Sequence, residues 1–163
     1  MTIHLRPATL ADAPFLADVV IQATMVQGRF PPDVDEDEYR ADYEAWTRET
    51  VLGRIPGCTL SVVEKDAHPI GRLPVVRDGT GITLAGIQLL PAFQNQRIGS
   101  GLVEDLKREA DQQNVPLLIG VEKDNPHAQR FYARLGCRVV GEDGDEISSR
   151  ILSTARPISV ILY

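Results

Sequence analysis

The chain has 163 residues, which is enough for one domain with a full hydrophobic core. Hydrophobic residues make up 43% of it, no apolar run approaches the ~20 residues of a membrane span, and the N-terminus alternates like a strand and unlike a signal peptide. The formal net charge of −6 argues against general nucleic-acid binding. We therefore expect one cytoplasmic domain over residues 1–163 that binds neither nucleic acid nor membranes.

The first part of the chain is predicted to form a strand and two helices. Residues 2–6 alternate between apolar and polar, as a strand does. Thr9 is expected to cap a helix with Asp12 at its N3 position, because apolar residues then recur at helical spacing. After a Pro-Pro break, residues 35–52 are predicted as a second helix.

Three strands are predicted next, over residues 59–64, 70–76 and 82–90. Turns rich in Gly, Asp and Pro separate them, which favours an antiparallel meander. Proline has no N–H for a ladder bond, so Pro74 predicts a bulge or an unpaired position in the middle strand.

The C-terminal part alternates between helices and strands. Residues 98–113 are predicted as a helix, and the apolar run 117–121 as a buried strand. Residues 126–135 have Pro at the first helical position and Gly136 after the last, so they indicate another helix. A strand follows over 138–142, and either 147–153 or 158–163 is the last strand.

The negative charge is concentrated in residues 31–50, which hold eight acids against two arginines. A solvated helix face is one explanation of this composition. The aromatic residues Tyr39, Tyr43 and Trp46 lie among the acids, so an acidic rim that attracts a cationic amine is the other. By contrast, Cys58 and Cys137 lie in apolar surroundings typical of reduced thiols, and no spacing of Cys, His and Asp resembles a metal site.

Two helix starts carry the most information about function. Residues 94–102 follow an apolar run and open an amphipathic helix, whose first N–H groups are unpaired and lie at the positive end of the helix dipole. Such a turn can hold a pyrophosphate. Residues 125–132 form a second capped helix start that ends in Tyr132.

Together these stretches resemble the GNAT (general-control-type N-acetyltransferase) superfamily. Residues 94–99 match its signature Q/R-x-x-G-x-G/A except that Arg97 replaces the middle glycine, and residues 125–136 match its Asn-Pro helix. Arg97 must adopt the backbone angles of the loop at some strain or tilt the loop. The resemblance implies an α/β (α+β) GNAT fold, a central mixed, mainly antiparallel sheet of about seven strands flanked by four helices.

The resemblance also implies acetyl-CoA as co-substrate and assigns residues to it. Those residues are Leu89, Leu90, Gln94, Asn95, Gln96, Arg97, Ile98, Gly99, Ser100, Gly101, Asn125 and Tyr132. Tyr132 would protonate the departing thiolate, and the N–H of Leu89 or Leu90 would bind the oxyanion. The spacing of the residues alone has a structural explanation, in which Tyr132 belongs to the apolar stripe of a helix and Asn125 caps that helix.

The base that deprotonates the amine is not evident in the sequence. Glu122 and Asp124 follow the predicted strand 117–121, where surface solvation is the simpler account of each acid, and Glu122 is our candidate for the base. We expect an N-acyltransferase that moves acetyl directly to a primary amine of a small molecule or peptide, with a cationic acceptor favoured.

Two other function classes stay open. One is a CoA-binding protein of the same fold without turnover, suggested by Arg97 and the missing base. The other is an unrelated nucleotide-binding domain, which the lack of a Lys-Ser/Thr pair after the glycines disfavours. No metal is expected, and a homodimer is among the oligomeric states that the sequence leaves open.

Overall fold

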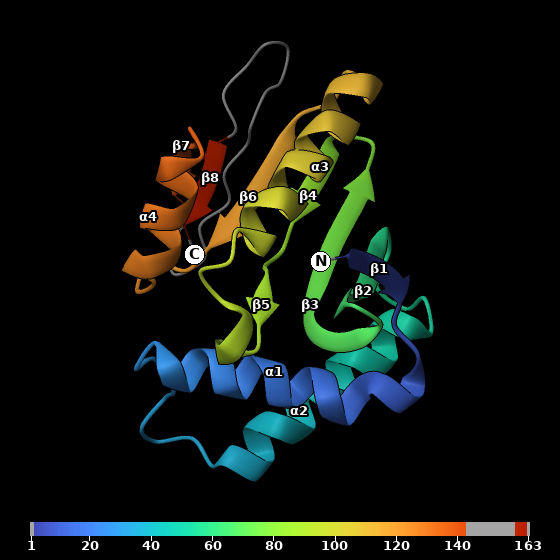
Figure 1. Cartoon of the computed structure of the whole chain (residues 1–163), viewed down its shortest axis with the longest axis vertical. Helices are drawn as coiled ribbons and strands as arrows, with labels where there is room; N and C mark the ends of the chain where they lie inside the picture. The colour runs from blue at the N-terminus through green and yellow to red at the C-terminus, as the bar shows by residue number, and fades with distance from the viewer. Residues whose placement is uncertain (1, 143–158, 163) are drawn as a thin grey trace. The chain divides into compact units, whose positions relative to one another are not determined.

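The structure is a computed structural model that describes residues 2–142 and 159–162 (Figure 1). The elements in chain order are β1 (Ile3–Pro7), η1 (Leu10–Asp12), α1 (Ala13–Val26), α2 (Glu36–Val51), β2 (Cys58–Lys65), β3 (His68–Asp78), β4 (Gly81–Leu84), β5 (Gln88–Leu89), η2 (Pro91–Phe93), α3 (Ile98–Gln113), β6 (Leu117–Val121), α4 (Pro126–Arg134), β7 (Arg138–Glu142) and β8 (Ser159–Leu162). Contacts divide the chain into unit 1, with Met1–Pro74 and Ile87–Ile98, and unit 2, with Val75–Gly86 and Gly99–Tyr163. In the described part, no helix has the length and apolarity that crossing a membrane requires.

Unit 1 contains the strands β1, β2 and β5, the first half of β3, and two helices. β1 and β2 pair antiparallel, and a tight turn joins β2 to β3 through Asp66 and Ala67, whose φ angles are 50° and 66°. Two successive left-handed residues are typical of a type I′ hairpin, which makes β2 and β3 antiparallel neighbours. Helices α1 and α2 pack against each other, and α2 packs on β2. The core between them centres on Leu16, Leu60 and Val62.

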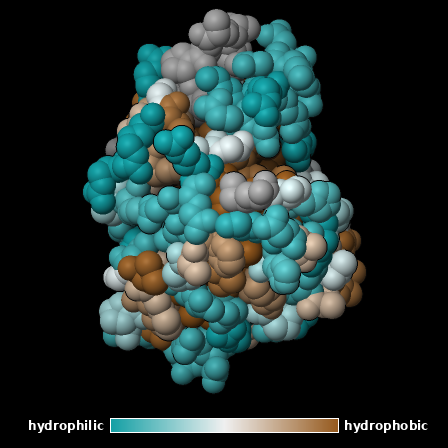
Figure 2. Space-filling model, viewed as in Figure 1, coloured by the Kyte–Doolittle hydropathy of each residue, from teal (hydrophilic) through white to brown (hydrophobic). Residues whose placement is uncertain are grey.

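Capping residues precede η1 and α2 in unit 1. Asp35 accepts hydrogen bonds from the N–H groups of Asp37 and Glu38 at 3.0 and 3.1 Å, which confirms the predicted start of the second helix. The first helix differs from its prediction, because the turn that Thr9 caps is the short 3-10 helix η1 and α1 begins at Ala13. In Figure 2, the surface at the end of the molecule where α2 begins is hydrophilic.

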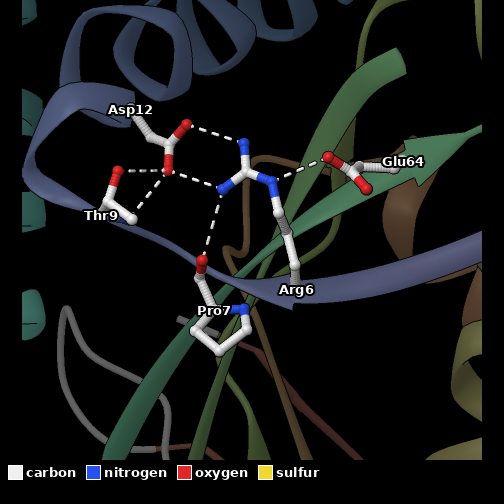
Figure 3. Close-up of polar contacts among 5 residues, drawn as sticks. All are labelled: Arg6, Pro7, Thr9, Asp12 and Glu64. Carbon is white, nitrogen blue, oxygen red and sulfur yellow. Dashed lines mark hydrogen bonds and ion pairs between the residues drawn. The ribbon is translucent and has the colours of Figure 1, made fainter. Parts of the chain in front are cut away.

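An ion-pair network ties β1, η1 and β2 together (Figure 3). The guanidinium of Arg6 donates to both carboxylate oxygens of Asp12 at 2.8 and 2.9 Å, and its Nε donates to Glu64 at 2.7 Å. The backbone N–H of Thr9 donates to the same Asp12 carboxylate at 2.7 Å. The hydrogen bonds that Asp12 accepts, led by those from Arg6, lower its pKa from 3.8 to about 2.

Unit 2 is built on the second half of β3. That half pairs antiparallel with β4, β4 and β6 are parallel, and β8 lies between β6 and β7. Helix α3 has the predicted bounds, and it buries the apolar side chains of Leu102, Val103, Leu106 and Ala110. β6 also has the predicted bounds, and all five of its residues are buried. β8 lies within 158–163, and the alternative strand 147–153 lies outside the described residues.

The predicted continuous strand 82–90 is wrong, because it is divided into β4 and β5. β4 ends with Leu84 opposite Val75, and β5 begins with Gln88 opposite Arg72. Three residues of the divided strand therefore lie opposite two of β3, one of which is Pro74, which confirms the predicted irregularity there.

The fold class is confirmed as mixed α/β, with four α-helices in the described residues and a sheet in which antiparallel pairs outnumber parallel ones. The described strands number eight where about seven were expected, since the divided strand counts twice.

The Arg6–Asp12 pair predicts an acid-dependent loss of stability. Because the folded-state pKa of Asp12 lies below its ordinary value, its contribution is full above pH 3.8 and is lost as the pH falls toward about 2. We expect Asp12→Asn to lower the free energy of unfolding at neutral pH by ~1–2 kcal/mol and to reduce this loss in urea titrations. Asp33→Asn, at an exposed site, is the control. Equal acid profiles for both variants would contradict the assignment.

Candidate functional site

Three side-chain hydrogen bonds hold the loop that precedes α3. The amide of Gln94 donates to the carbonyl of Leu89 at 3.0 Å, and the amide of Gln96 donates to that of Ala92 at 2.8 Å. Lys65 donates to the side-chain oxygen of Gln96 at 2.9 Å. The side chains of Gln94 and Gln96 therefore fix the loop, and its backbone N–H groups are the donors that the family resemblance assigns to a ligand.

The backbone of this loop presents unpaired donors. Asn95 and Arg97 have φ angles of 59° and 63°, in the left-handed region that favours glycine. Of the two outcomes expected for Arg97, the structure has the first: the arginine adopts the loop's backbone angles. No acceptor for the N–H groups of Asn95, Gln96 and Arg97 lies within the described part of the chain.

The chain continues from this loop directly into α3, whose first N–H groups have no intrahelical acceptor. Ile98 is buried, Ser100 is half-buried and Gly101 is exposed. A Cβ at Gly99 would lie 3.3 Å from the ring tip of Phe131, whereas one at Gly101 would meet nothing within 4 Å. A run of free N–H groups at a helix N-terminus fits a pyrophosphate, so the donors present suit the CoA that the resemblance implies.

The hydrogen bonds of β5 distinguish between Leu89 and Leu90. The N–H of Leu90 donates to the carbonyl of Ile70 at 2.8 Å. Backbone groups along an antiparallel strand alternate between facing the partner and facing away, so the N–H of Leu89 is directed away from β3. The bond from Gln94 to the carbonyl of Leu89 agrees with this orientation. Of the two leucines, Leu89 keeps a donor outside the ladder.

Helix α4 positions Asn125 and Tyr132 within unit 2. The side chain of Asn125 accepts from the N–H of Ala128 at 3.0 Å, so its capping role is confirmed. Tyr132 is only 4% exposed, and its ring lies against Phe131 with centroids 4.9 Å apart. Burial, with a smaller contribution from Cys137, raises the pKa of Tyr132. Its hydroxyl therefore stays protonated at neutral pH, as a proton donor must.

The candidate base Glu122 lies at the surface. Glu122 and Asp124 are exposed in the turn between β6 and α4, and the amide of Gln129 holds this turn by donating to the carbonyl of Lys123 at 2.8 Å. Cys58 and Cys137 are free thiols. Within residues 2–142 and 159–162, no cluster of three or more His, Cys, Asp and Glu side chains could hold a metal ion.

The acidic helix α2 directs its aromatic residues toward an arginine that the sequence analysis did not single out. The rings of Tyr43 and Trp46 lie 5.5 and 4.8 Å from the guanidinium of Arg72 on β3. Arg72 is 4% exposed. The only local signal was an arginine inside an apolar strand. Several acids around α2 are in ion pairs, namely Asp18 with Arg40, Glu44 with Arg48, and Glu49 with Arg54.

Comparisons with known proteins identify a family and several similar structures. The family model described as "Acetyltransferase (GNAT) family" matches residues 23–137. The PaiA N-acetyltransferase of Thermoplasma acidophilum, in complex with coenzyme A, has a similar structure with a TM-score of 0.76 and 17% identity over 94% of this chain and 100% of that chain. An acetyltransferase of Thermus thermophilus has a TM-score of 0.70 and 21% identity over 97% and 98% of the two chains.

Apo-YjaB of Escherichia coli is also similar, with a TM-score of 0.62 and 21% identity over 86% of each chain. Similarity at these identities shows the fold alone. The comparison with curated protein sequences finds no match.

Proposed function

Because the chain belongs to the acetyltransferase (GNAT) family, we propose that it transfers an acetyl group from acetyl-CoA directly to a primary amine. The observation that carries the proposal is the loop at residues 95–97, whose N–H groups lack acceptors in the described structure and lead into a helix N-terminus. The similar T. acidophilum acetyltransferase binds coenzyme A, which supports the same ligand here.

The family match supports a single transferase domain. It runs from residue 23 to residue 137 and so includes parts of both units. We propose that units 1 and 2 belong to one domain over residues 1–163. A cytoplasmic location and a homodimer stay predictions.

In the proposed reaction, the amine nitrogen attacks the thioester carbonyl, the C–S bond breaks, and CoA leaves as a thiolate. The N–H groups of residues 95–101 bind the pyrophosphate, with Asn125 beside the CoA arm as the family resemblance implies. The N–H of Leu89 stabilises the oxyanion, since that of Leu90 is bonded to Ile70. Tyr132 protonates the thiolate.

The attacking amine must first lose a proton. For a lysine-like amine with a pKa of ~10.4, this costs ~4.6 kcal/mol at pH 7, so a base or a water chain must accept the proton. Glu122 is the candidate, and its exposed position suits transfer to solvent. The strained Arg97 and this exposed base are also the observations that favour the second candidate function, a CoA-binding protein without turnover.

The pyrophosphate site is tested at Gly99. We expect Gly99→Val to weaken CoA binding at least tenfold, about 1.4 kcal/mol, because the added side chain reaches the space of the phosphates. The same side chain would also press on Phe131. Calorimetry should therefore include the double variant Gly99→Val/Phe131→Leu, in which the ring tip is removed. Binding that recovers in the double variant would show that packing, and not phosphate contact, caused the loss.

The general acid is tested by Tyr132→Phe, which keeps the buried ring and removes the hydroxyl. We expect a loss of ~10²-fold or more in kcat, with the free energy of unfolding little changed. Steady-state assays with acetyl-CoA and a productive amine measure this. Phe131→Leu is the matched control for packing in α4. Turnover of Tyr132→Phe within about twofold of wild type would leave Tyr132 as a core residue only.

The acceptor is tested with a panel of primary amines, following the release of free CoA and the acetylated product. We propose a cationic acceptor, because α2 begins with acids that lie exposed around its N-terminus. Exposed charges are screened beyond ~8 Å at physiological salt, so KM for the amine should rise with ionic strength. The variant Asp35→Asn/Glu36→Gln/Asp37→Asn/Glu38→Gln should also raise it and leave KM for acetyl-CoA unchanged. Asn at position 35 retains the cap.

Two outcomes of this panel would contradict parts of the proposal. Tight binding of acetyl-CoA without release of thiol to any amine would favour the CoA-binding protein without turnover. An amine KM that changes with neither salt nor the quadruple substitution would leave the acids of α2 as a solvated surface.

A further inference from the structure

Arg72 is a buried charge that has no acidic partner among the described residues. Its side chain lies on the first half of β3, its exposed fraction is 4%, and no described atom accepts a hydrogen bond from its buried Nε. Among the described residues it forms no ion pair, whereas Arg6 and Arg77 each bind carboxylates at 2.7 Å. Its guanidinium contacts the aromatic rings of Tyr43 and Trp46 on α2.

Tyr43 and Cys58 act on Arg72 most strongly after burial, and neither supplies a negative charge at neutral pH. Burial raises the pKa of Tyr43 to about 12, and it also raises the pKa of the Cys58 thiol. Burial lowers the pKa of Arg72 itself to about 10, which leaves the guanidinium charged. A buried, uncompensated charge is strongly destabilising, and cation–π contacts offset only part of that cost. Stability alone therefore does not account for an arginine here.

The residue opposite Arg72 on β5 has a buried acceptor that lacks a donor among the described residues. Gln88 on β5 is the direct cross-strand partner of Arg72, so both side chains project from the same face of the sheet. The side-chain oxygen of Gln88 is buried, and no donor for it lies in the part of the chain that the structure describes. Donors without an acceptor thus lie beside an acceptor without a donor, and the two side chains do not bond to each other. A ligand that brings both an anionic oxygen and an N–H would satisfy both.

We propose that Arg72, Gln88, Tyr43 and Trp46 form a binding site for the carboxylate of the acceptor, which is an amino acid or another amine that carries a carboxylate. The guanidinium binds a planar carboxylate through two parallel hydrogen bonds, and Gln88 accepts from an N–H of the same ligand. The inference rests on the proposed function in that it identifies the acceptor of that reaction. An ammonium on the same molecule remains compatible with the acids of α2.

Trp46 makes binding measurable without turnover. It is the only tryptophan of the chain and lies 4.8 Å from the guanidinium, so its fluorescence responds to an anion bound there. The probes are matched pairs with and without a carboxylate, alanine with ethylamine and lysine with 1,5-diaminopentane, together with inorganic phosphate. We expect saturable changes with alanine or lysine and none with the decarboxylated amines. A saturable response to phosphate alone would overturn the assignment to a carboxylate.

Two substitutions of Arg72 test its role. Arg72→Lys keeps the charge and loses the planar pair of donors, so we expect carboxylate affinity to fall at least tenfold, about 1.4 kcal/mol. Arg72→Met should abolish the response and raise the midpoint of urea unfolding, because an apolar side chain replaces an uncompensated charge. Arg77→Met on the same strand removes the ion pair with Glu109 and should keep the wild-type fluorescence response.

The outcomes separate this site from the proposed function. Saturable fluorescence changes without any release of CoA would contradict the transferase reaction and leave the carboxylate site standing. Turnover with equal kcat/KM for both members of each pair would contradict the site and leave the transferase reaction standing. An unchanged response in Arg72→Lys would also overturn the site. A lower unfolding midpoint in Arg72→Met would give Arg72 a structural role and overturn the argument from stability.

Discussion

The break between β4 and β5 opposite Pro74 is the constraint on which the rest of the structure depends. Pro74 has no N–H to donate, and three residues of the divided strand lie opposite two of β3. The ladder therefore ends and begins again, with β5 on the first half of β3 and β4 on the second. A Cβ at Gly71 would lie 2.5 Å from the carbonyl of Gln88, so β5 approaches this closely only because residue 71 is glycine. The contacts of the chain divide into two units at the same break.

Local signals were sufficient for most of the fold. The bounds of α3 and β6 and the stop at Gly136 were predicted because each depends on residues a few positions apart. The division of the strand 82–90 was not predicted, because its apolar pattern is continuous and the cause of the division lies partly in β3. Pro74 signalled an irregularity in its own strand, but its effect on the neighbour depends on register, which long-range pairing decides.

The candidate site also has a part that local sequence predicts and a part that depends on long-range contacts. The loop before α3 was predictable because its chemistry is that of unpaired backbone groups near a helix N-terminus, and the left-handed Arg97 followed from its place in the signature. Arg72 was not predictable, because its significance depends on α2 and β5 bringing aromatic rings and Gln88 to it. The aromatic residues among the acids suggested a cation, and the cation that Tyr43 and Trp46 face is an internal one.

The central claim is that acetyl moves from acetyl-CoA directly to an amine. A single-turnover reaction with the protein in excess over acetyl-CoA tests this, with intact-mass measurement of the protein and quantification of CoA and acetylated amine at each time. The account predicts that CoA and acetylated amine form in equal amounts while the mass of the protein stays unchanged. An acetyl group that accumulates on the protein, or CoA released without acetylated amine, would contradict it.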